Sequence, residues 1–434
     1  MVANVPREKP ISKEHRMLSR IPVEILEDEK LKAAIANLPD TYNFEIFKTI
    51  WKIRQQNIKN VALQFPEGLL MFSCIIADIL EEFANCNTVI MTDVAYGACC
   101  VDDFAVKALD CQLLVHYGHS CLIPLNNTCH AQVLYVFVDI KFSISHLVDT
   151  IRKNFPKESK IALMSTVQFA IRQELHEEYN SSVAQSKPLS PGETLGCTAA
   201  KLPPEIDTLL FVGDGRFHLE AAMIANPTVT AYKYSDVLFF LKSIFAKCSL
   251  CSHKVQDNRR FVQWNMFSSS FFLLLEYDPY SRKCTIENYN HEVMQRTRRY
   301  AIDQAKCCHK FGIILGTLGR QGNCAIVDLL KRKLEERKRE VFLFLLAEIN
   351  PETLNTFSDI ECWVQVACPR LSIDWGVMFS KPLLTPYELM VSLEQVQWET
   401  VYPMDYYAND SLGPWTNNHG KMVHKPRVTI KYTS

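Results

Sequence analysis

The sequence has almost no net charge and no long apolar run. Its 434 residues include 47 Lys and Arg against 48 Asp and Glu, a formal net charge of -1. A chain of this kind lacks the overall positive charge that is typical of proteins that bind nucleic acid or acidic membranes. No apolar run reaches the ~18 residues that a membrane-spanning helix needs, and the first residues lack the apolar stretch of a signal peptide. We therefore expect a cytoplasmic protein with no membrane and no direct nucleic-acid partner.

The sequence also lacks the best-known catalytic motifs. It contains no G-x-S-x-G elbow, no H-E-x-x-H helix and no protein-kinase signature. The Gly-rich segment 316–322 matches neither the P-loop nor the dinucleotide-binding pattern. We favour a carboxylate or ribose contact there, or a tight turn, over a nucleotide-phosphate site. His116 and His119 form a His-x-x-His pair, for which we favour hydrogen-bonding or ligand-contact roles over metal binding.

Cysteine, by contrast, is abundant, with 16 residues. In a large chain expected in the cytoplasm, this number indicates buried thiols or metal ligands and argues against disulfides. Cys99, Cys197 and Cys368 each follow an apolar run and lie beside Gly or Pro, although each could be an ordinary core or turn residue. Adjacent side chains of an extended chain point to opposite faces, so only one of Cys99 and Cys100 can readily face a given site. The spacing does not say which.

Short apolar runs alternate with helical patterns along most of the chain, which indicates βαβ units and mainly parallel sheets. We predict strands near nine segments: 61–65, 89–92, 113–116, 133–138, 160–164, 208–212, 312–315, 341–345 and 362–366. These runs fall into three related α/β domains of about 100 residues each, a usual domain size. The predicted divisions are an N-terminal arm (1–43), domain 1 (44–155), domain 2 (156–300), domain 3 (301–400) and a C-terminal tail (401–434).

One segment does not fit this pattern. Residues 235–277 interrupt domain 2 with Phe-, Ser- and Leu-rich sequence of no clear period. Cys248, Cys251 and His253 within it suggest zinc, but zinc needs four ligands and no second pair follows at finger spacing. The run 268–275 resembles translated pyrimidine-rich intron, so we hypothesise a retained intron. Correctly spliced cDNA reads that contain the segment would contradict this hypothesis.

The three cysteines suggest a metal cluster held between domains. A cluster of this kind needs one thiolate at the end of a core element in each domain. Three sulfur ligands on a four-iron cluster leave one iron open, and an open iron can do chemistry as well as hold a fold together. The alternative is a plain α/β small-molecule-binding protein with reduced core cysteines. Iron and sulfide analysis of anaerobically purified protein would separate the two.

Long motifs relate the sequence to a known family. From about residue 45 to 420 the chain resembles the eukaryotic diphthamide synthases, the 2-(3-amino-3-carboxypropyl)histidine synthases. The motifs that carry this resemblance hold the three cysteines, both histidines and the Gly-rich turns: residues 96–103, 115–124, 189–198, 213–220, 315–322, 364–376, 402–407 and 411–416. The family pattern would run from Tyr234 directly to Asp278, so residues 235–277 form an insert. If it is translated, the insert puts the packing of domain 2 in doubt, and with it the placement of Cys197.

The resemblance implies three related α/β domains around a [4Fe–4S] cluster, with Cys99, Cys197 and Cys368 as its ligands and Cys100 not a ligand. It implies transfer of the 3-amino-3-carboxypropyl group of S-adenosylmethionine to a histidine of translation elongation factor 2, the first step of diphthamide biosynthesis, by a radical mechanism. It also implies a heterodimer with a related second subunit and a small metalloprotein electron donor. The alternative is a non-catalytic, cluster-bearing electron-transfer or structural partner in the same complex.

Four side chains are candidates for contact with S-adenosylmethionine, from their context alone: Arg320, Gln321, Arg370 and Asp374. Arginine binds a carboxylate through two parallel hydrogen bonds, which suits the methionine end of the co-substrate. Arg370 and Asp374 could instead form an ordinary solvated ion pair at a strand end. On the first interpretation, loss of Arg370 weakens S-adenosylmethionine binding without removing iron.

Overall fold

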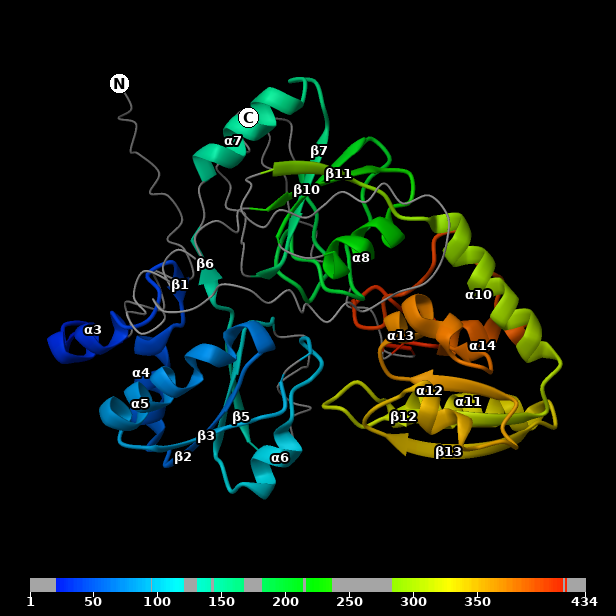
Figure 1. Ribbon diagram of the computed structural model, residues 1–434, viewed down its shortest axis with the longest axis horizontal. Coiled ribbons are helices and arrows are strands. Elements are labelled where there is room, and N and C mark those ends of the chain that lie inside the picture. Colours follow the sequence, from blue (N-terminus) through cyan, green and yellow to red (C-terminus); the bar gives the residue numbers. More distant parts are fainter. Residues whose placement is uncertain are drawn as a thin grey trace, which may run out of the picture.

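The computed structural model describes residues 21–94, 96–120, 131–141, 144–167, 182–213, 216–235, 283–416 and 418–419. Within these ranges the chain forms three α/β domains, each on its own mostly parallel sheet (Figure 1). The predicted fold class is therefore confirmed. The suggested zinc ligands Cys248, Cys251 and His253 lie outside the described residues, as does all of the segment 235–277 except Ser235.

Domain 1, blue to cyan in Figure 1, is a four-stranded parallel sheet with helices on both faces. Its elements are α4 (Ile46–Gln56), β2 (Asn60–Gln64), η1 (Glu67–Phe72), α5 (Ser73–Ala84), β3 (Asn87–Ile90), α6 (Asp103–Ala108), β4 (Leu113–Tyr117) and β5 (Gln132–Val136). The strand order is β3-β2-β4-β5. Alternate residues of β2 enter different cores, since Val61 and Leu63 pack with α4 and α5 whereas Ala62 packs with α6. A strand buried on both faces explains the near-continuous apolar run.

The described part of the predicted N-terminal arm is packed onto domain 1. It forms α2 (Val23–Leu26), α3 (Glu29–Ile35) and β1 (Tyr42–Asn43), and β1 pairs with β6 (Asp139–Ile140). Ile25, Leu31 and Leu38 are buried in the same core as α4 and α5. From residue 21 onward this segment is therefore part of domain 1 and not a separate arm, because its apolar residues cover the outer side of two helices.

Domain 2, green in Figure 1, has a five-stranded sheet in the order β11-β10-β9-β7-β8, parallel except for β11. Its elements are α7 (Ile144–Asn154), β7 (Ile161–Ser165), β8 (Ser182–Val183), β9 (Thr208–Val212), α8 (Phe217–Ala225), β10 (Thr230–Ser235) and β11 (Lys283–Glu287). The predicted boundary at 155/156 is too late. Leu147 and Ile151 of α7 are buried against Leu163 and Leu210 of this sheet, so α7 belongs to domain 2.

The residues that flank the undescribed stretch 236–282 are paired with each other in the sheet. Ser235 ends β10 and is paired with Lys283, the first residue of β11, at the edge of the sheet. A segment whose ends are already adjacent adds only a slowly growing loop-closure cost. Among the described residues, the sheet of domain 2 therefore continues from β10 into β11.

Domain 3, yellow to orange in Figure 1, is a parallel sheet in the order β13-β12-β14-β15. Its elements are β12 (Lys310–Gly316), α11 (Cys324–Glu336), β13 (Glu340–Leu346), α12 (Pro351–Asn355), β14 (Cys362–Val366), α13 (Pro369–Trp375), η5 (Gly376–Met378), β15 (Leu383–Leu384) and α14 (Pro386–Ser392). The helix α10 (His291–Lys306) runs across the predicted boundary at 300/301. Domains 2 and 3 are thus joined by a continuous helix.

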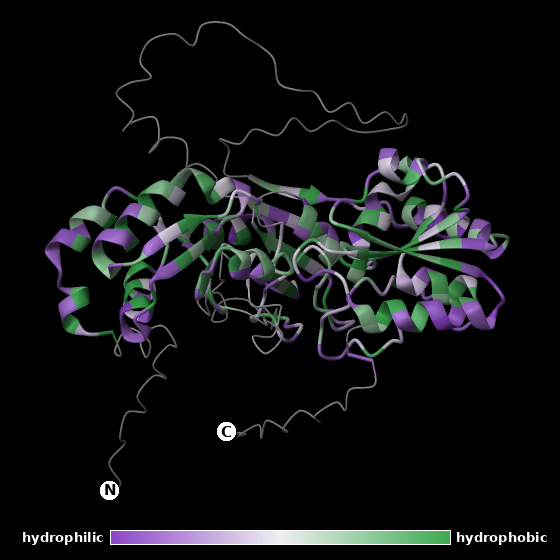
Figure 2. Ribbon diagram, turned by 90° about the horizontal axis from the view of Figure 1, so that it is seen from below, coloured by the Kyte–Doolittle hydropathy of each residue, from purple (hydrophilic) through white to green (hydrophobic). Residues whose placement is uncertain are grey.

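Residues 401–416, predicted as part of a tail, return to domain 2. Tyr402, Met404, Tyr406 and Trp415 are buried in the same core as Phe211 and other residues of domain 2. Four large side chains in a core bury too much apolar surface for a free tail. Figure 2 shows the same organisation throughout, with apolar strands inside each domain and polar residues along the outer sides of the helices.

Candidate metal centre

Each of the three predicted ligands lies just beyond the carboxyl end of a parallel strand. Cys99 lies in the loop from β3 to α6, and Cys368 directly follows β14 and precedes α13. Cys197 follows a segment in which Glu193 bridges to Ser165 at the end of β7. All three thiols are partly buried. Open α/β sheets bind their ligands at this edge, so the fold places one thiol of each domain where a ligand is expected.

The three thiols lie close enough to act on one another. The hydrogen bond with Cys100, burial and the neighbouring Cys197 and Cys368 raise the pKa of Cys99 well above its usual range. Burial and the nearby Cys368 raise the pKa of Cys197, and burial raises that of Cys368. Burial followed by the same three thiols raises the pKa of Tyr407. The thiols of three domains therefore lie near enough to influence one another and the phenol of Tyr407.

The donor set suits an iron–sulfur cluster better than a single ion. Among the residues that the structure describes, no three His, Cys, Asp or Glu side chains are grouped tightly enough to hold one metal ion. A cluster of several irons binds thiolates at separate corners and so spreads its ligands over a wider volume. Burial opposes ionisation of these thiols unless a cationic group compensates, and a coordinating metal does so. An all-thiol, partly buried trio therefore fits a cluster.

The structure distinguishes Cys99 from its neighbour. Cys197 and Cys368 contribute to the raised pKa of Cys99, whereas Cys100 is buried and accepts a hydrogen bond from Gln321 Nε2 at 3.4 Å. The hydrogen bond with Cys99 lowers the pKa of Cys100. The thiol that faces the other two domains is Cys99, which supports the choice that the resemblance implied.

Arg370 joins the cysteine loops of domains 2 and 3. Its guanidinium donates to Asp374 Oδ2 at 2.7 Å, to the carbonyls of Gly196 at 3.1 Å and Phe217 at 2.7 Å, and to Glu220 Oε2 at 2.6 Å. These bonds use four of its five N–H donors, and Arg370 is only 2% exposed. Since Gly196 precedes Cys197, this arginine fixes one ligand loop against the other. The structure gives Arg370 and Asp374 this connecting role, and their predicted contact with S-adenosylmethionine stays a prediction.

Arg320 makes the equivalent connection between domains 3 and 1. Its side chain binds Asp103 through two hydrogen bonds of 2.9 and 2.6 Å, and its backbone N–H donates to the Cys99 carbonyl at 2.8 Å. Gly319, at φ +54°, lies so close that an added Cβ would be 2.6 Å from Cys100 Cα. The Gly-rich segment therefore packs on the Cys99 loop, which explains why it matches no phosphate-binding motif.

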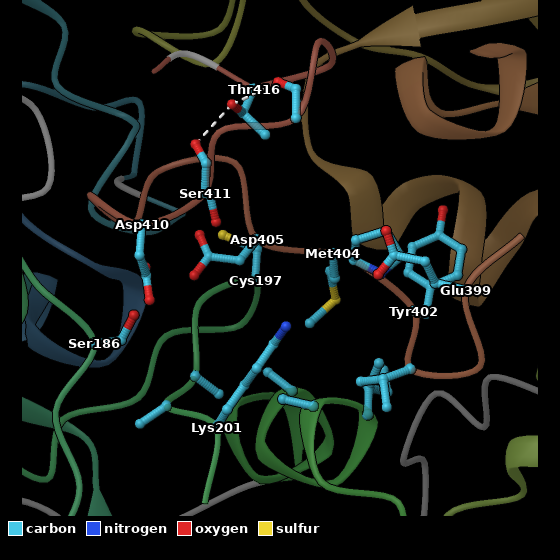
Figure 3. Close-up of a pocket in the computed structure, with 18 of the residues that line it drawn as sticks. Ser186, Cys197, Lys201, Glu399, Tyr402, Met404, Asp405, Asp410, Ser411 and Thr416 are labelled. Carbon is cyan, nitrogen blue, oxygen red and sulfur yellow. Dashed lines mark hydrogen bonds between the residues drawn. The ribbon is translucent and has the colours of Figure 1, made fainter. Parts of the chain in front are cut away.

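Cys197 also lines a cavity of about 420 Å³ between domain 2 and the segment 399–416. Figure 3 shows the Cys197 sulfur beside Asp405, with Lys201 and Met404 on the opposite wall. Thr198 donates to Asp405 at 3.1 Å, and burial raises the pKa of that carboxyl. The volume is in the range of small-molecule sites. One member of the trio thus borders a cavity that could admit a small ligand.

Sequence reasoning missed three residues of this region. Tyr407 contacts the trio, Asp103 holds Arg320 and Glu220 holds Arg370. Asp103, Glu220 and Tyr407 all lie inside motifs that carried the resemblance (96–103, 213–220 and 402–407), so these motifs were a signal. The pairing of Glu220 with Arg370 gave no local signal, because the two residues are 150 positions apart.

The family model described as "Putative diphthamide synthesis protein" matches residues 65–244 and 257–403. The chain belongs to this diphthamide synthesis family. The match continues to residue 244 and resumes at 257, so the break in the family pattern is shorter than the predicted insert 235–277. Both ends of the break lie outside the described residues.

Curated relatives in the diphthamide synthesis family are similar over nearly the whole chain. The 2-(3-amino-3-carboxypropyl)histidine synthase subunit 1 of Bos taurus is 48% identical over 94% of this chain and 84% of the relative. The protein of the same name from Caenorhabditis elegans is 46% identical over 95% of this chain and 97% of the relative. These matches place the chain in diphthamide synthesis and support a transferase.

The fold is similar to that of a solved structure. The crystal structure of Dph2 from Pyrococcus horikoshii with a 4Fe-4S cluster matches with a TM-score of 0.62 and 23% identity, over 84% of this chain and 94% of that chain. At this identity the likeness shows the fold alone. No helix among the described residues is both long and apolar enough to span a membrane.

Proposed function

We propose that this chain holds a [4Fe–4S] cluster through Cys99, Cys197 and Cys368 and transfers the 3-amino-3-carboxypropyl group of S-adenosylmethionine to a histidine of translation elongation factor 2. The observation that carries the proposal is the meeting of one thiol from each domain beside Tyr407. The names of the relatives and the cluster of the Pyrococcus structure support it.

When bound, the cluster would supply one electron and an open iron for breaking the Cγ–S bond of S-adenosylmethionine. The protein's own residues fix where this can occur. Arg370 and Arg320 hold the ligand loops of domains 2 and 1 against domain 3. Cys99 packs against the buried apolar side chains Ala98, Leu189 and Leu195, which keep water away and limit side reactions. We propose that both arginines act on the co-substrate only indirectly, through these loops.

Cysteine-to-serine variants test the proposed ligands. Anaerobically purified Cys99→Ser, Cys197→Ser and Cys368→Ser proteins should each lose most iron and sulfide and the visible absorbance, because serine replaces a thiolate ligand. Cys100→Ser is the matched control and should keep all three. Equal iron in the Cys99→Ser and Cys100→Ser proteins would contradict the assignment. Full transferase activity after loss of the cluster would instead favour a non-catalytic, cluster-bearing partner.

The partners belong to the same proposal. The relatives are named as a first subunit, which supports a complex with a related second subunit, and a one-electron reaction needs a donor such as a small metalloprotein. A cytoplasmic site of action follows from a substrate that works in translation. Co-expression with a related second subunit should yield a complex on size-exclusion chromatography, and transfer should depend on an added reductant. Full activity of the isolated chain would contradict the heterodimer.

A further inference from the structure

Five buried polar atoms lie unpaired between domains 1 and 2. No described residue hydrogen-bonds to any of them: His116 Nε2, His119 Nδ1, Ser120 Oγ, Thr166 Oγ1 and Glu193 Oε1. More than nine in ten buried polar groups in native proteins have a partner. Several exceptions in one region therefore call for a ligand or for ordered water.

These atoms come from the carboxyl ends of β4 and β7. The His116 and His119 rings are 5.5 Å apart, and Ser120 lies close enough to Glu193 to influence its pKa, without hydrogen-bond geometry. Thr166 follows Ser165, which is bridged to Glu193. The approach of Ser120 to Glu193 thus links the two groups of side chains into one region, here called the polar chamber.

Hydrogen bonds fix the character of His116. Gln64 Nε2 donates to the Cys100 carbonyl at 2.9 Å, so Gln64 Oε1 faces His116 Nδ1 at 2.9 Å. Because that oxygen can only accept, Nδ1 carries the proton and Nε2 presents a lone pair. Burial lowers the pKa of His116 to about 3, so the ring is neutral. His116 therefore offers the chamber an acceptor.

Glu193 offers a second acceptor, and no described residue forms an ion pair with it. It is 3% exposed, and its Oε2 accepts the Ser190 amide at 2.9 Å. His119 and His218 add no charge to this region near neutral pH, since burial lowers the pKa of each to about 4. Burial raises the pKa of Glu193, so the ionised carboxylate calls for a cation or several hydrogen-bond donors.

The polar chamber adjoins the thiol trio. Gln64 connects His116 to the carbonyl of Cys100. On the other side, Leu195, two residues after Glu193, packs in a cluster with Ala98 and Cys99. A ligand that occupies the chamber therefore lies beside the proposed cluster.

We propose that the polar chamber binds the primary ammonium group of the amino-acid end of S-adenosylmethionine, with Glu193 and His116 as acceptors; this inference rests on the proposed function. An ammonium group has three donors and no acceptor, which complements a carboxylate oxygen, an imidazole lone pair and two hydroxyls. Glu193 and His116 would hold the chain that is transferred while the adenosine end stays outside the chamber.

Paired ligands test the assignment. Binding of S-adenosylmethionine and of methylthioadenosine, which lacks the amino-acid end, is measured by calorimetry on the anaerobic, cluster-loaded protein. Glu193→Gln keeps the acceptor for Ser190 but loses the charge, so it should weaken the binding of S-adenosylmethionine by about tenfold to a hundredfold and leave the binding of methylthioadenosine unchanged. Ser120→Ala should weaken the binding of S-adenosylmethionine by a smaller factor and also leave the binding of methylthioadenosine unchanged. Ser392→Ala, a buried serine in α14, is the matched control and should change neither.

The outcomes separate this inference from the proposed function. If the wild-type protein binds neither ligand, the proposed function itself fails. If it binds S-adenosylmethionine and Glu193→Gln weakens both ligands equally, or neither, the chamber holds only water or serves the fold, and the inference is overturned. Normal S-adenosylmethionine binding with a raised KM for the protein substrate would also overturn it, since the chamber would then receive the target histidine.

Discussion

At the scale of single residues, the same carboxylate meets two arginines in different surroundings. Glu220 binds Arg370, which is buried, and also Arg216, which is about half exposed. Buried partners that lose their counter-ion leave an uncompensated charge, whereas exposed pairs contribute little. The two arginines therefore form a matched pair for measuring what holds the cysteine loops together.

Arg370→Ala should lower the free energy of unfolding by about 2–4 kcal/mol. This is no more than the cost of removing one partner of a fully buried ion pair, because the carboxylates of Glu220 and Asp374 are partly exposed. Arg216→Ala should cost about 0–1 kcal/mol. Urea unfolding measures both. Since Arg370 spans Gly196 and Asp374, we also expect part of the iron to be lost. A stable Arg370→Ala protein with full iron and weak S-adenosylmethionine binding would restore the role first predicted.

His116 should make the protein sensitive to acid. Its pKa is about 3 in the folded state because of burial and about 6.5 when unfolded. The unfolded state thus binds the extra proton between these values, so stability falls as the pH drops from about 6.5 towards 3. At pH 5 the loss from this residue is about 2 kcal/mol.

The measurement compares wild type with His116→Asn, whose amide can still donate to Gln64. Urea midpoints at pH 7.5 and pH 5.0 should differ less in the variant, because other titrating groups are common to both proteins. An identical pH dependence in the two proteins would show that His116 does not titrate as its burial predicts.

At the scale of elements, the strands β10 and β11 show how a long segment can be accommodated. Five residue pairs join them, ending at Ser235 and Lys283. Cys197 lies on a different part of domain 2, beyond the carboxyl end of β7. The two ends of the segment, Ser235 and Lys283, therefore lie on strands that β9 separates from β7.

Replacing residues 236–282 by a four-residue turn containing Asn-Gly should leave the fold intact. Loop-closure entropy predicts a gain of about 1–2 kcal/mol in the free energy of unfolding, and Asn-Gly suits a tight hairpin. Iron content should match that of the full chain. Loss of iron or of cooperative unfolding would mean that the segment contributes to the structure around Cys197.

At the scale of the whole molecule, a buried ion pair joins the helices α10 and α14. Arg298 in α10 binds Glu388 in α14 through bonds of 2.7 and 2.6 Å, and it also donates to the carbonyls of Ser372 and Leu383. The Tyr402 hydroxyl donates to the same carboxylate at 3.0 Å. One charge pair thus joins three parts of the molecule: the helix α10, domain 3 and the segment 401–416.

Glu388→Gln should lower the free energy of unfolding by about 3–5 kcal/mol, because it leaves Arg298 buried without a counter-charge. Glu336→Gln, which removes the exposed partner of Lys333, is the control and should cost about 0–1 kcal/mol. Similar losses in the two variants would show that the buried pair does not join the domains as proposed.

Local patterns anticipated the core strands. Runs such as 113–116 and 362–366 are apolar because strands buried on both faces need apolar residues throughout, and they became β4 and β14. The domain divisions were less predictable. The sequence pattern of an amphipathic helix such as α7 is the same whichever sheet the helix covers. Only the contacts of α7 with Leu163 and Leu210 show that it belongs to domain 2.

The sequence by itself determined the α/β class, the parallel strands and the family, because these depend on short-range patterns and long motifs. The tertiary structure decided which thiols lie near one another, what the two arginines hold and that Glu193 is buried with no cation among the described residues. The reason is physical: burial, pKa and hydrogen-bond partners depend on groups that are distant along the chain, and no local pattern records them.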